Sequence, residues 1–255
     1  MPRSATYEPN STSLFRLSRF GVQFFLDCPR CFYLKNKLGI SQVPQIPFTL
    51  NNAVNDLLVN EFDIYRRNHE PHPIMVENNL DAIPFDHEKI DDWRNNKKGV
   101  FYEDHDRGFH LFGAIDDVWI NKKTNQLIIA DYKATSKKEE VSLDADWQIS
   151  YKNQIEFYQW LLRKNGFEVQ DEGYFVYCNG NKTEERFDNV LTFRVSLLSH
   201  SGTGAWIEPT LDKIKTCLDS DKIPTYTSGC KHCEYVKTNF DLYKKLVNEK
   251  NKPST

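Results

Sequence analysis

Residues 126–135 have the sequence QLIIADYKAT, and the strand that they predict decides the fold. The apolar run LIIA predicts a buried strand, which then continues into Asp131, Tyr132 and Lys133. Because residues two apart on a strand share a face, Asp131 and Lys133 are expected to lie together, with Tyr132 on the opposite face. The polar end of this strand is therefore the first candidate for a functional site.

The segments around this strand predict a mixed α/β fold in one domain. Periodicity and turn residues predict helices at 18–39, 51–67, 144–167 and 204–221, and strands at 99–104, 109–120, 126–135, 172–180 and 189–199. Between the second helix and the first strand, proline-rich residues 69–97 predict a long loop with a short helix at most. The expected organisation is a flexible tail at 1–15, a single domain at 16–240 with a core at about 49–200, and a helix end and tail at 241–255.

Composition limits the possible functions. The chain has 255 residues, 39% apolar and 13% aromatic, with a net charge of −3, so no global positive field attracts it to nucleic acid or to an anionic membrane. No apolar run reaches the roughly 18 residues that suggest a membrane span, and the N-terminus lacks a signal-peptide pattern. We expect a cytoplasmic protein without a membrane partner.

The loop NKKTN at 121–125 predicts a hairpin that places a second acid beside the first. If the loop is centred near Lys123 and Thr124, residues whose numbers add to about 247 face each other, so Asp116 lies opposite Asp131. Two adjacent carboxylates repel, and a divalent cation such as Mg²⁺ or Mn²⁺ between them removes the repulsion. The alternative is a salt bridge between Lys133 and Asp131 at the edge of the sheet.

The predicted helix at 144–167 carries two further polar candidates. Gln154 and Tyr158 are four residues apart, so they share a helix face with Trp147 and Tyr151. A glutamine on this largely apolar stripe needs a hydrogen-bond partner, and the strand that carries Lys133 can provide one. Otherwise Gln154 simply lies at the rim of the core.

Four of the six cysteines form two C-x-x-C pairs, Cys28 with Cys31 and Cys230 with Cys233. Four thiolates complete a tetrahedral zinc site or hold an iron–sulfur cluster. The two pairs are about 200 residues apart in sequence, so a shared site would join the two ends of the domain. The alternative is that they are ordinary buried or loop cysteines.

GAID at 113–116, DYK at 131–133 and QIEFY at 154–158 resemble, in this order, the motifs of the PD-(D/E)XK nuclease superfamily. The closest resemblance is to its RecB-like branch, which includes CRISPR-associated RecB-like exonucleases and AddB-type nuclease domains. It implies a restriction-endonuclease-like core, a central mixed sheet flanked by helices. It also implies a metal held by Asp116, Asp131 and the carbonyl of Tyr132, with Lys133 catalytic and Gln154 and Tyr158 as the Q-x-x-x-Y pair.

One position departs from that branch. Its first motif has a glycine followed four residues later by a metal-binding histidine, and these places are Asn51 and Asn55 here. The Asn55 amide oxygen is a weaker ligand for a hard cation than the usual groups. Asp56 or Glu61 offers a compensating carboxylate, and the alternative is a metal site that has lost function.

The segment CPRCFYL at 28–34 is similar to a segment of the same branch whose cysteine joins a C-terminal group around a 4Fe–4S cluster. The C-terminal group is shorter here, so Cys31 would be the fourth ligand. We expect a shared metal site of Cys28, Cys31, Cys230 and Cys233 that holds either a cluster or zinc, with the cluster slightly preferred.

The leading hypothesis is a metal-dependent nuclease that acts on single- or double-stranded DNA; a helicase or a repair or defence protein as partner is left open. The basic residues expected to contact phosphates are Arg16, Arg19, Arg30, Lys35, Lys37, Lys137 and Lys138. The main alternative is a weakly active or inactive nuclease-fold module that binds nucleic acid or acts as a scaffold. A third is a zinc-containing globular protein unrelated to nucleic acid.

Overall fold

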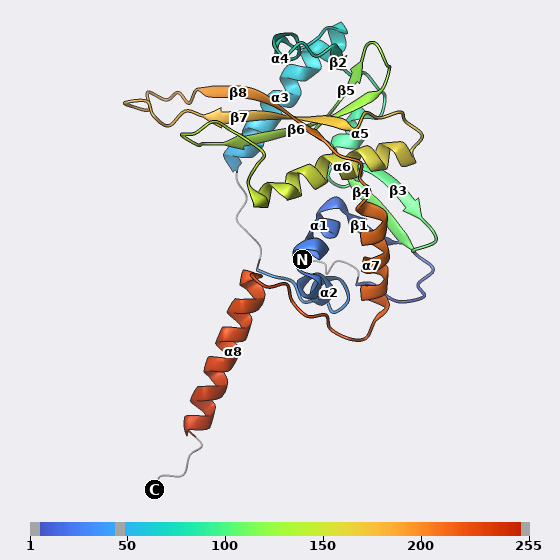
Figure 1. Cartoon of the computed structure of the whole chain (residues 1–255), viewed down its shortest axis with the longest axis vertical. Helices are drawn as coiled ribbons and strands as arrows, with labels where there is room; N and C mark the ends of the chain where they lie inside the picture. The colour runs from blue at the N-terminus through green and yellow to red at the C-terminus, as the bar shows by residue number, and fades with distance from the viewer. Residues whose placement is uncertain (1–5, 44–48, 251–255) are drawn as a thin grey trace.

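The computed structural model describes residues 6–43 and 49–250, which form a mixed α/β fold around strand β6 (Leu127–Thr135) (Figure 1). The other strands are β1 (Phe15–Ser18), β2 (Ala82–Pro84), β3 (Val100–Asp104), β4 (Phe109–Gly113), β5 (Asp117–Asn121), β7 (Glu172–Gly180) and β8 (Phe193–Ser201). The helices are α1 (Arg19–Asp27), α2 (Pro29–Asn36), α3 (Thr49–Asn68), α4 (Pro73–Glu77), α5 (Ile90–Arg94), the 3₁₀ turn η1 (Asp146–Gln148), α6 (Ile149–Lys164), α7 (Ile207–Asp219) and α8 (Lys231–Lys250).

Strand β6 lies in the middle of a five-stranded mixed sheet with the order β2-β5-β6-β7-β8. It pairs antiparallel with β5 and parallel with β7, and the connection from β6 to β7 runs through α6. Two parallel strands need a long connection between them, and the segment that contains α6 provides it. The predicted class, a mixed sheet flanked by helices, is confirmed.

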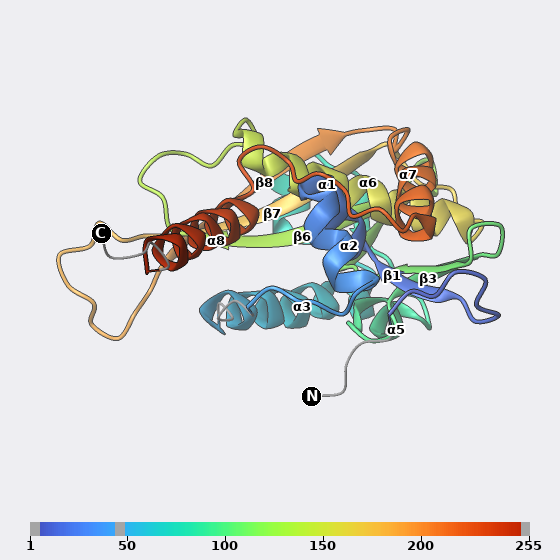
Figure 2. The same ribbon diagram turned by 90° about the horizontal axis from the view of Figure 1, so that it is seen from below.

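The two faces of β6 belong to different parts of the core. Ile129 packs in the cluster that contains the apolar face of α6, whereas Tyr132 packs with Leu58 of α3 in a second cluster. Because residues alternate along a strand, Asp131 and Lys133 share the α6 side with Ile129. The sheet therefore lies between α3 and α6, and the polar end of β6 faces α6 (Figure 2).

The segment 109–120, predicted as one strand, is instead two strands in different sheets. β4 joins β1 and β3 in a three-stranded sheet ordered β1-β4-β3, while β5 joins the five-stranded sheet. Between them, the Ile115 amide donates a hydrogen bond to the Trp93 carbonyl at 3.0 Å, so the strand ladder is interrupted. Burial continues to alternate through Gly113, Ile115 and Asp117, and the sequence pattern therefore gave no sign of the break.

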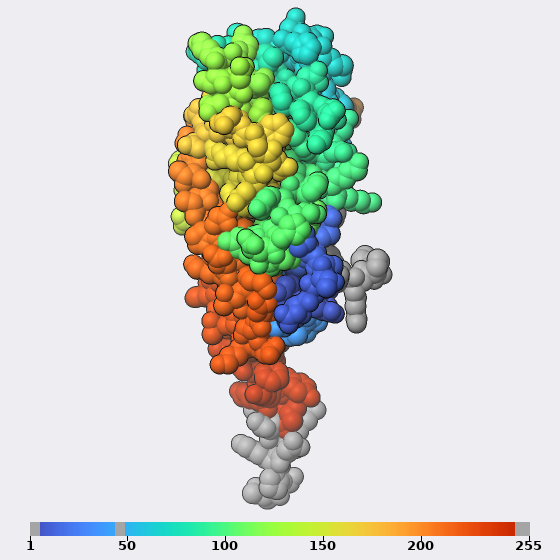
Figure 3. Space-filling model, turned by 90° about the vertical axis from the view of Figure 1, so that its right-hand side faces the viewer, coloured from blue at the N-terminus to red at the C-terminus, as the bar shows by residue number. Residues whose placement is uncertain are grey.

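At two places the structure has ordered elements or contacts where the sequence predicted a loop or a flexible tail. Residues 69–97 contain α4, α5 and β2 rather than one short helix in a loop. Tyr7 lies in the expected N-terminal tail, yet it is buried and its hydroxyl donates to Asp219 of α7. Figure 3 shows this N-terminal segment in dark blue between the β3–β4 hairpin and α7.

Helix α8 extends away from the rest of the molecule (Figure 1). It runs from Lys231 to Lys250, so the domain boundary expected at 240 falls inside it. None of the described helices is long and apolar enough to cross a membrane.

Candidate active site

The hairpin of β5 and β6 places Asp116 beside Asp131. Asp117 pairs with Ala130 and Val118 with Ile129, so facing residue numbers add to 247 as the loop predicted. Asp116 directly precedes the first paired residue, and its carboxylate accepts a hydrogen bond from the Tyr132 amide at 2.8 Å. Its side chain is therefore held next to the polar end of β6.

The Asp131 carboxylate is the least satisfied polar group of the site. Asp131 is fully buried, and no backbone amide or neutral side chain among the described residues donates to its carboxylate. Its one polar partner among those residues is the Lys133 ammonium, which forms an ion pair with a single carboxylate oxygen. A buried carboxylate with open lone pairs is costly unless something else binds it, and a cation fits that requirement.

Burial and nearby charges shift the pKa values of Asp116 and Lys133, the two ionisable neighbours of Asp131. Burial and the Asp131 charge raise the pKa of Asp116 to about 7. For Lys133, burial lowers the pKa, but the charges of Asp131 and Asp116 outweigh it and raise the pKa above its ordinary value. The lysine is therefore held protonated beside two carboxylates that repel each other.

Helix α6 brings Gln154 and Tyr158 to Lys133. The Lys133 ammonium donates to the Gln154 side-chain oxygen at 3.4 Å, and the Gln154 amide nitrogen donates to the Tyr158 hydroxyl at 3.2 Å. Tyr151, one turn earlier, places its ring 4.6 Å from the Lys133 nitrogen. Tyr151 was recognised as a neighbour of Gln154 but not as a contact of the lysine, which depends on how far α6 lies from β6.

Asp117, the second acid of the pair at 116–117, has a different environment. It is fully buried, and its carboxylate accepts from Arg94 at 2.8 Å, from the Trp119 indole at 3.0 Å and from the Tyr132 hydroxyl at 2.9 Å. Arg66 pairs with it as well. The Asp117 carboxylate oxygens are therefore fully engaged by donors, whereas the Asp116 carboxylate can still bind a ligand.

This network around Asp117 also holds the start of β5 in place. Asp63 of α3 pairs with Arg66 and Arg94 at 2.9 Å each, and Arg94 donates to the Asp116 carbonyl at 3.1 Å. Burial lowers the pKa of Arg94, but the charges of Asp117 and Asp63 outweigh this effect and raise the pKa above its ordinary value. The sequence does not predict these positioning residues, because they come from α3 and α5 and carry no local motif.

Asn55 lies on α3, which packs on the side of β6 that carries Tyr132. Its side chain is half-buried and forms no hydrogen bond with any described residue, so it is not bonded to Asp116 or Asp131. The possible substitutes are engaged or exposed: Glu61 accepts from His72 at 2.9 Å, and Asp56 is exposed. The predicted metal-binding roles of Asn55 and of the Tyr132 carbonyl stay predictions.

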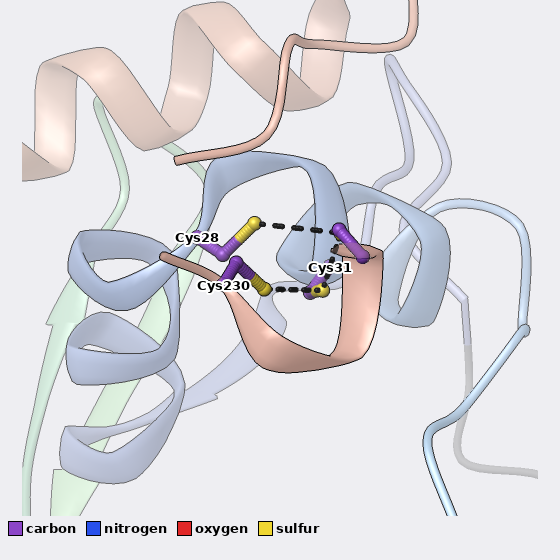
Figure 4. A group of neighbouring side chains, drawn as sticks. Cys28, Cys31 and Cys230 are labelled. Carbon is purple, nitrogen blue, oxygen red and sulfur yellow. Dashed lines mark hydrogen bonds between the residues drawn. The ribbon is translucent and has the colours of Figure 1, made fainter. Parts of the chain in front are cut away.

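The two cysteine pairs meet at the other end of the domain (Figure 4). Cys28 caps α2 and Cys31 lies in its first turn, while Cys230 precedes α8 and Cys233 lies in the first turn of α8. All four sulfurs lie within 4.8 Å of one another. We call these residues the four-cysteine cluster, and it joins the N- and C-terminal segments as the sequence predicted.

The sulfurs of the four-cysteine cluster are arranged closely enough to share one cation. Cys28 and Cys233 are 3.9 Å apart, Cys31 and Cys230 3.7 Å, and Cys31 and Cys233 3.3 Å. Burial opposes ionisation of Cys28, but the backbone amides of Cys31 and Thr227 lower its pKa to about 7. Burial raises the pKa of Cys31 to about 11. Three of the four cysteines are buried and Cys230 is half-buried, and four thiolates so close together need a cation to ionise together.

These features define a class of protein: an α/β domain with two acids and a lysine at adjacent strand ends. The model of the PD-(D/E)XK nuclease superfamily matches residues 49–238, and the chain belongs to this superfamily. Cys230 and Cys233 lie inside the matched region, whereas Cys28 and Cys31 lie before it.

Comparison with individual proteins adds little. No curated protein matches the chain. Among solved structures, one described as "Crystal structure of SSO0001" is 16% identical, with 87% of this chain and 82% of that chain covered and a TM-score of 0.41.

Proposed function

We propose that the protein is a nuclease that hydrolyses phosphodiester bonds of DNA and depends on Mg²⁺ or Mn²⁺. The observation that carries this proposal is the Asp131 carboxylate, fully buried beside Asp116 with the Lys133 ammonium as its one polar partner among the described residues. Oxygen ligands of this kind suit hard divalent cations. Membership in the nuclease superfamily supports the same reaction.

The side chains divide the work as follows. Asp116 and Asp131 would hold the ion, which acts as a Lewis acid and lowers the pKa of the attacking water. Lys133 carries a raised pKa, so at neutral pH its ammonium stabilises negative charge that develops on the phosphate and does not act as a base. Gln154 accepts from Lys133 and orients its ammonium, and Tyr158 fixes Gln154.

The test is cleavage of single- and double-stranded DNA by the full chain in Mg²⁺ or Mn²⁺. Lys133→Ala is expected to cut about 10² to 10³ times more slowly, the usual effect of removing one group that stabilises transition-state charge. The matched control is Lys122→Ala, because Lys122 pairs with Asp81 on the surface away from this site. Equal rates for Lys133→Ala and the wild type would contradict the proposal.

A second candidate function is a nuclease-fold module that binds nucleic acid without cutting it. The observation that favours it is Asn55, which replaces an expected histidine and has no hydrogen bond to either acid. In that case DNA binding would be measurable and would not depend on Asp131. Metal-dependent cleavage that is lost in Asp131→Asn would exclude this function.

We also propose that the chain belongs to the RecB-like branch and that zinc occupies the four-cysteine cluster. The Q-x-x-x-Y pair beside Lys133 and the meeting of CPRC with CKHC support the branch. Four ligands around one zinc ion, with Zn–S near 2.3 Å, are about 3.8 Å apart; three of the sulfur pairs here are 3.3, 3.7 and 3.9 Å apart, and all four sulfurs lie within 4.8 Å of one another. A 4Fe–4S cluster binds each thiolate to a different iron and needs wider spacing.

Metal analysis of purified protein tests this assignment. We expect one zinc per chain and no visible absorption band, whereas a brown protein with iron and sulfide would show that the cluster is the occupant. Thiolates that bind metal must stay reduced, which supports the cytoplasmic location that the sequence predicted.

A further inference from the structure

A groove of about 940 Å³ lies on the surface formed by the N-terminal segment, α1, α2 and the β3–β4 hairpin. Its lining includes Arg16 of β1, Phe20 and Phe24 of α1, Lys35 of α2 and Phe112 of β4. We call these five residues the aromatic-basic groove. None of them has a role in the proposed chemistry.

The cations of this groove have no acidic partners. Among the described residues Arg16 and Lys35 form no ion pair: the Arg16 guanidinium lies 4.4 Å from the Phe112 ring centre and donates to the Lys97 carbonyl. The Lys35 ammonium lies 5.8 Å from the Phe20 ring and 5.6 Å from the Phe24 ring. Cations without counter-ions are the groups that attract phosphates.

The other cations that line the same hollow are paired with acids. Arg107 pairs with Asp104, Glu208 and Asp212 at distances of 2.7 to 3.0 Å, and Lys215 pairs with Asp219. Arg16 and Lys35 are therefore the lysine and arginine side chains of the described lining that have no ion pair.

The same groove exposes flat aromatic surface. Phe20 is 60% exposed, and its ring is stacked against Phe24 at 6.2 Å with planes 10° apart. On the sheet, Phe112 adjoins His110 at 5.9 Å, and His110 is stacked on Phe101, which is 48% exposed. Exposed rings interleaved with cations are the platform on which unpaired bases stack, because paired bases hide their faces from a protein.

Strand β4 separates the groove from the candidate active site. Residues alternate along a strand, so Phe112 lies on the groove side of β4 and Gly113 on the opposite, buried side. On that side a Cβ added at Gly113 would lie 2.5 Å from the Tyr158 ring, and Tyr158 contacts Gln154, which contacts Lys133. The groove is therefore a binding surface distinct from the two acids.

We infer that the aromatic-basic groove binds a single-stranded nucleic acid, with a base stacked on Phe20 and phosphates beside Arg16 and Lys35. The binding itself stands on the groove alone, and its link to cleavage rests on the proposed function.

Binding is measured by fluorescence anisotropy with Lys133→Ala as the parent, so that cleavage does not interfere. The probes are a labelled oligothymidylate, an oligouridylate of equal length and a DNA duplex. Adding Phe20→Ala is expected to weaken single-strand binding at least about fivefold, the lower end of the effect of losing one stacked base. Phe20→Tyr keeps a ring and should bind like the parent.

Two further variants separate this contact from a general effect. Phe240→Ala removes a phenyl of similar exposure, 54%, from α8 and should leave binding unchanged. Lys35→Ala should reduce the slope of log affinity against log salt by about 0.7, as expected for one phosphate contact on a single strand.

Equal affinity of Phe20→Ala and its parent, or duplex binding as tight as single-strand binding, would overturn the inference. Tighter binding of DNA than RNA, or the reverse, supports it and identifies the strand. The proposed function fails separately: if the wild type binds the strand through Phe20 but never cuts in Mn²⁺, the groove stands and the nuclease assignment does not.

Discussion

The candidate active site and the four-cysteine cluster both gather ionisable groups in a buried place, but they are built in opposite ways. Asp116 and Asp131 lie on one hairpin, 15 residues apart, and the network around Asp117 holds the hairpin without a metal. Cys28 and Cys233 are separated by 205 residues and approach each other only where the N-terminal ends of α2 and α8 meet. The first site is therefore held in place by its own hydrogen bonds and ion pairs, whereas the proposed zinc would be what holds the second together.

The largest expected effect tests the first half of this comparison. Asp131→Asn should lower the rate of DNA cleavage about 10³-fold or more, because it removes a charged ligand from the metal site. The melting temperature should stay close to that of the wild type, since the variant removes one of two repelling carboxylates and Asp116 remains as a counter-charge for Lys133. Asp81→Asn on the surface is the control. A large fall in melting temperature would show that Asp131 holds the fold together.

The second effect concerns the four-cysteine cluster. Cys233→Ser breaks the proposed cross-link, which closes a loop of about 200 residues, and loop-closure entropy sets its value near 5 kcal/mol. The melting temperature should fall by roughly 15 °C in a chain of this size. Cys217→Ser, which changes a cysteine outside the cluster, should have little effect. Equal melting temperatures for the two variants would mean that the cluster carries no stabilising metal.

The smallest effect is a pH dependence of stability without Mg²⁺ or Mn²⁺. The pKa of Asp116 is raised from 3.8 to about 7, so the folded state binds a proton more tightly than the unfolded state. Stability from this group is therefore present at low pH and is lost as pH rises from about 4 to about 7. Thermal melts across this range should show the decline in the wild type but not in Asp116→Asn. The same decline in both would assign it to another group.

Local patterns predicted what depends on short distances along the chain. The loop at 121–125 fixed the register that brings Asp116 opposite Asp131, and four-residue spacing placed Gln154 with Tyr158. Spacing alone did not show which acid of the pair at 116–117 stays open. That difference comes from Arg66 and Arg94, which reach Asp117 from other parts of the chain.

The rest of the fold depends on long-range contacts that leave no trace in the local pattern. The break between β4 and β5 is hidden because burial alternates through it without interruption. The meeting of the cysteine pairs was predicted from ligand chemistry, whereas their spacing required coordinates. Asn55 belongs with the untested predictions, since its role depends on how α3 is placed when an ion is bound.

The separation of Cys28 from Cys233 also sets an order of events during synthesis. The last strand of the five-stranded sheet ends at Ser201, so the sheet is complete while some 30 residues that contain Cys230 and Cys233 have still to be made. At ribosomal rates of about 5–20 residues per second, Cys230 and Cys233 are made a few seconds after the last strand of the sheet. During that time α1 and α2 lack the cysteines that would join them to α8. A chain that ends before Cys230 would contain Asp116, Asp131 and Lys133 but could not form the four-cysteine cluster that holds α1 and α2.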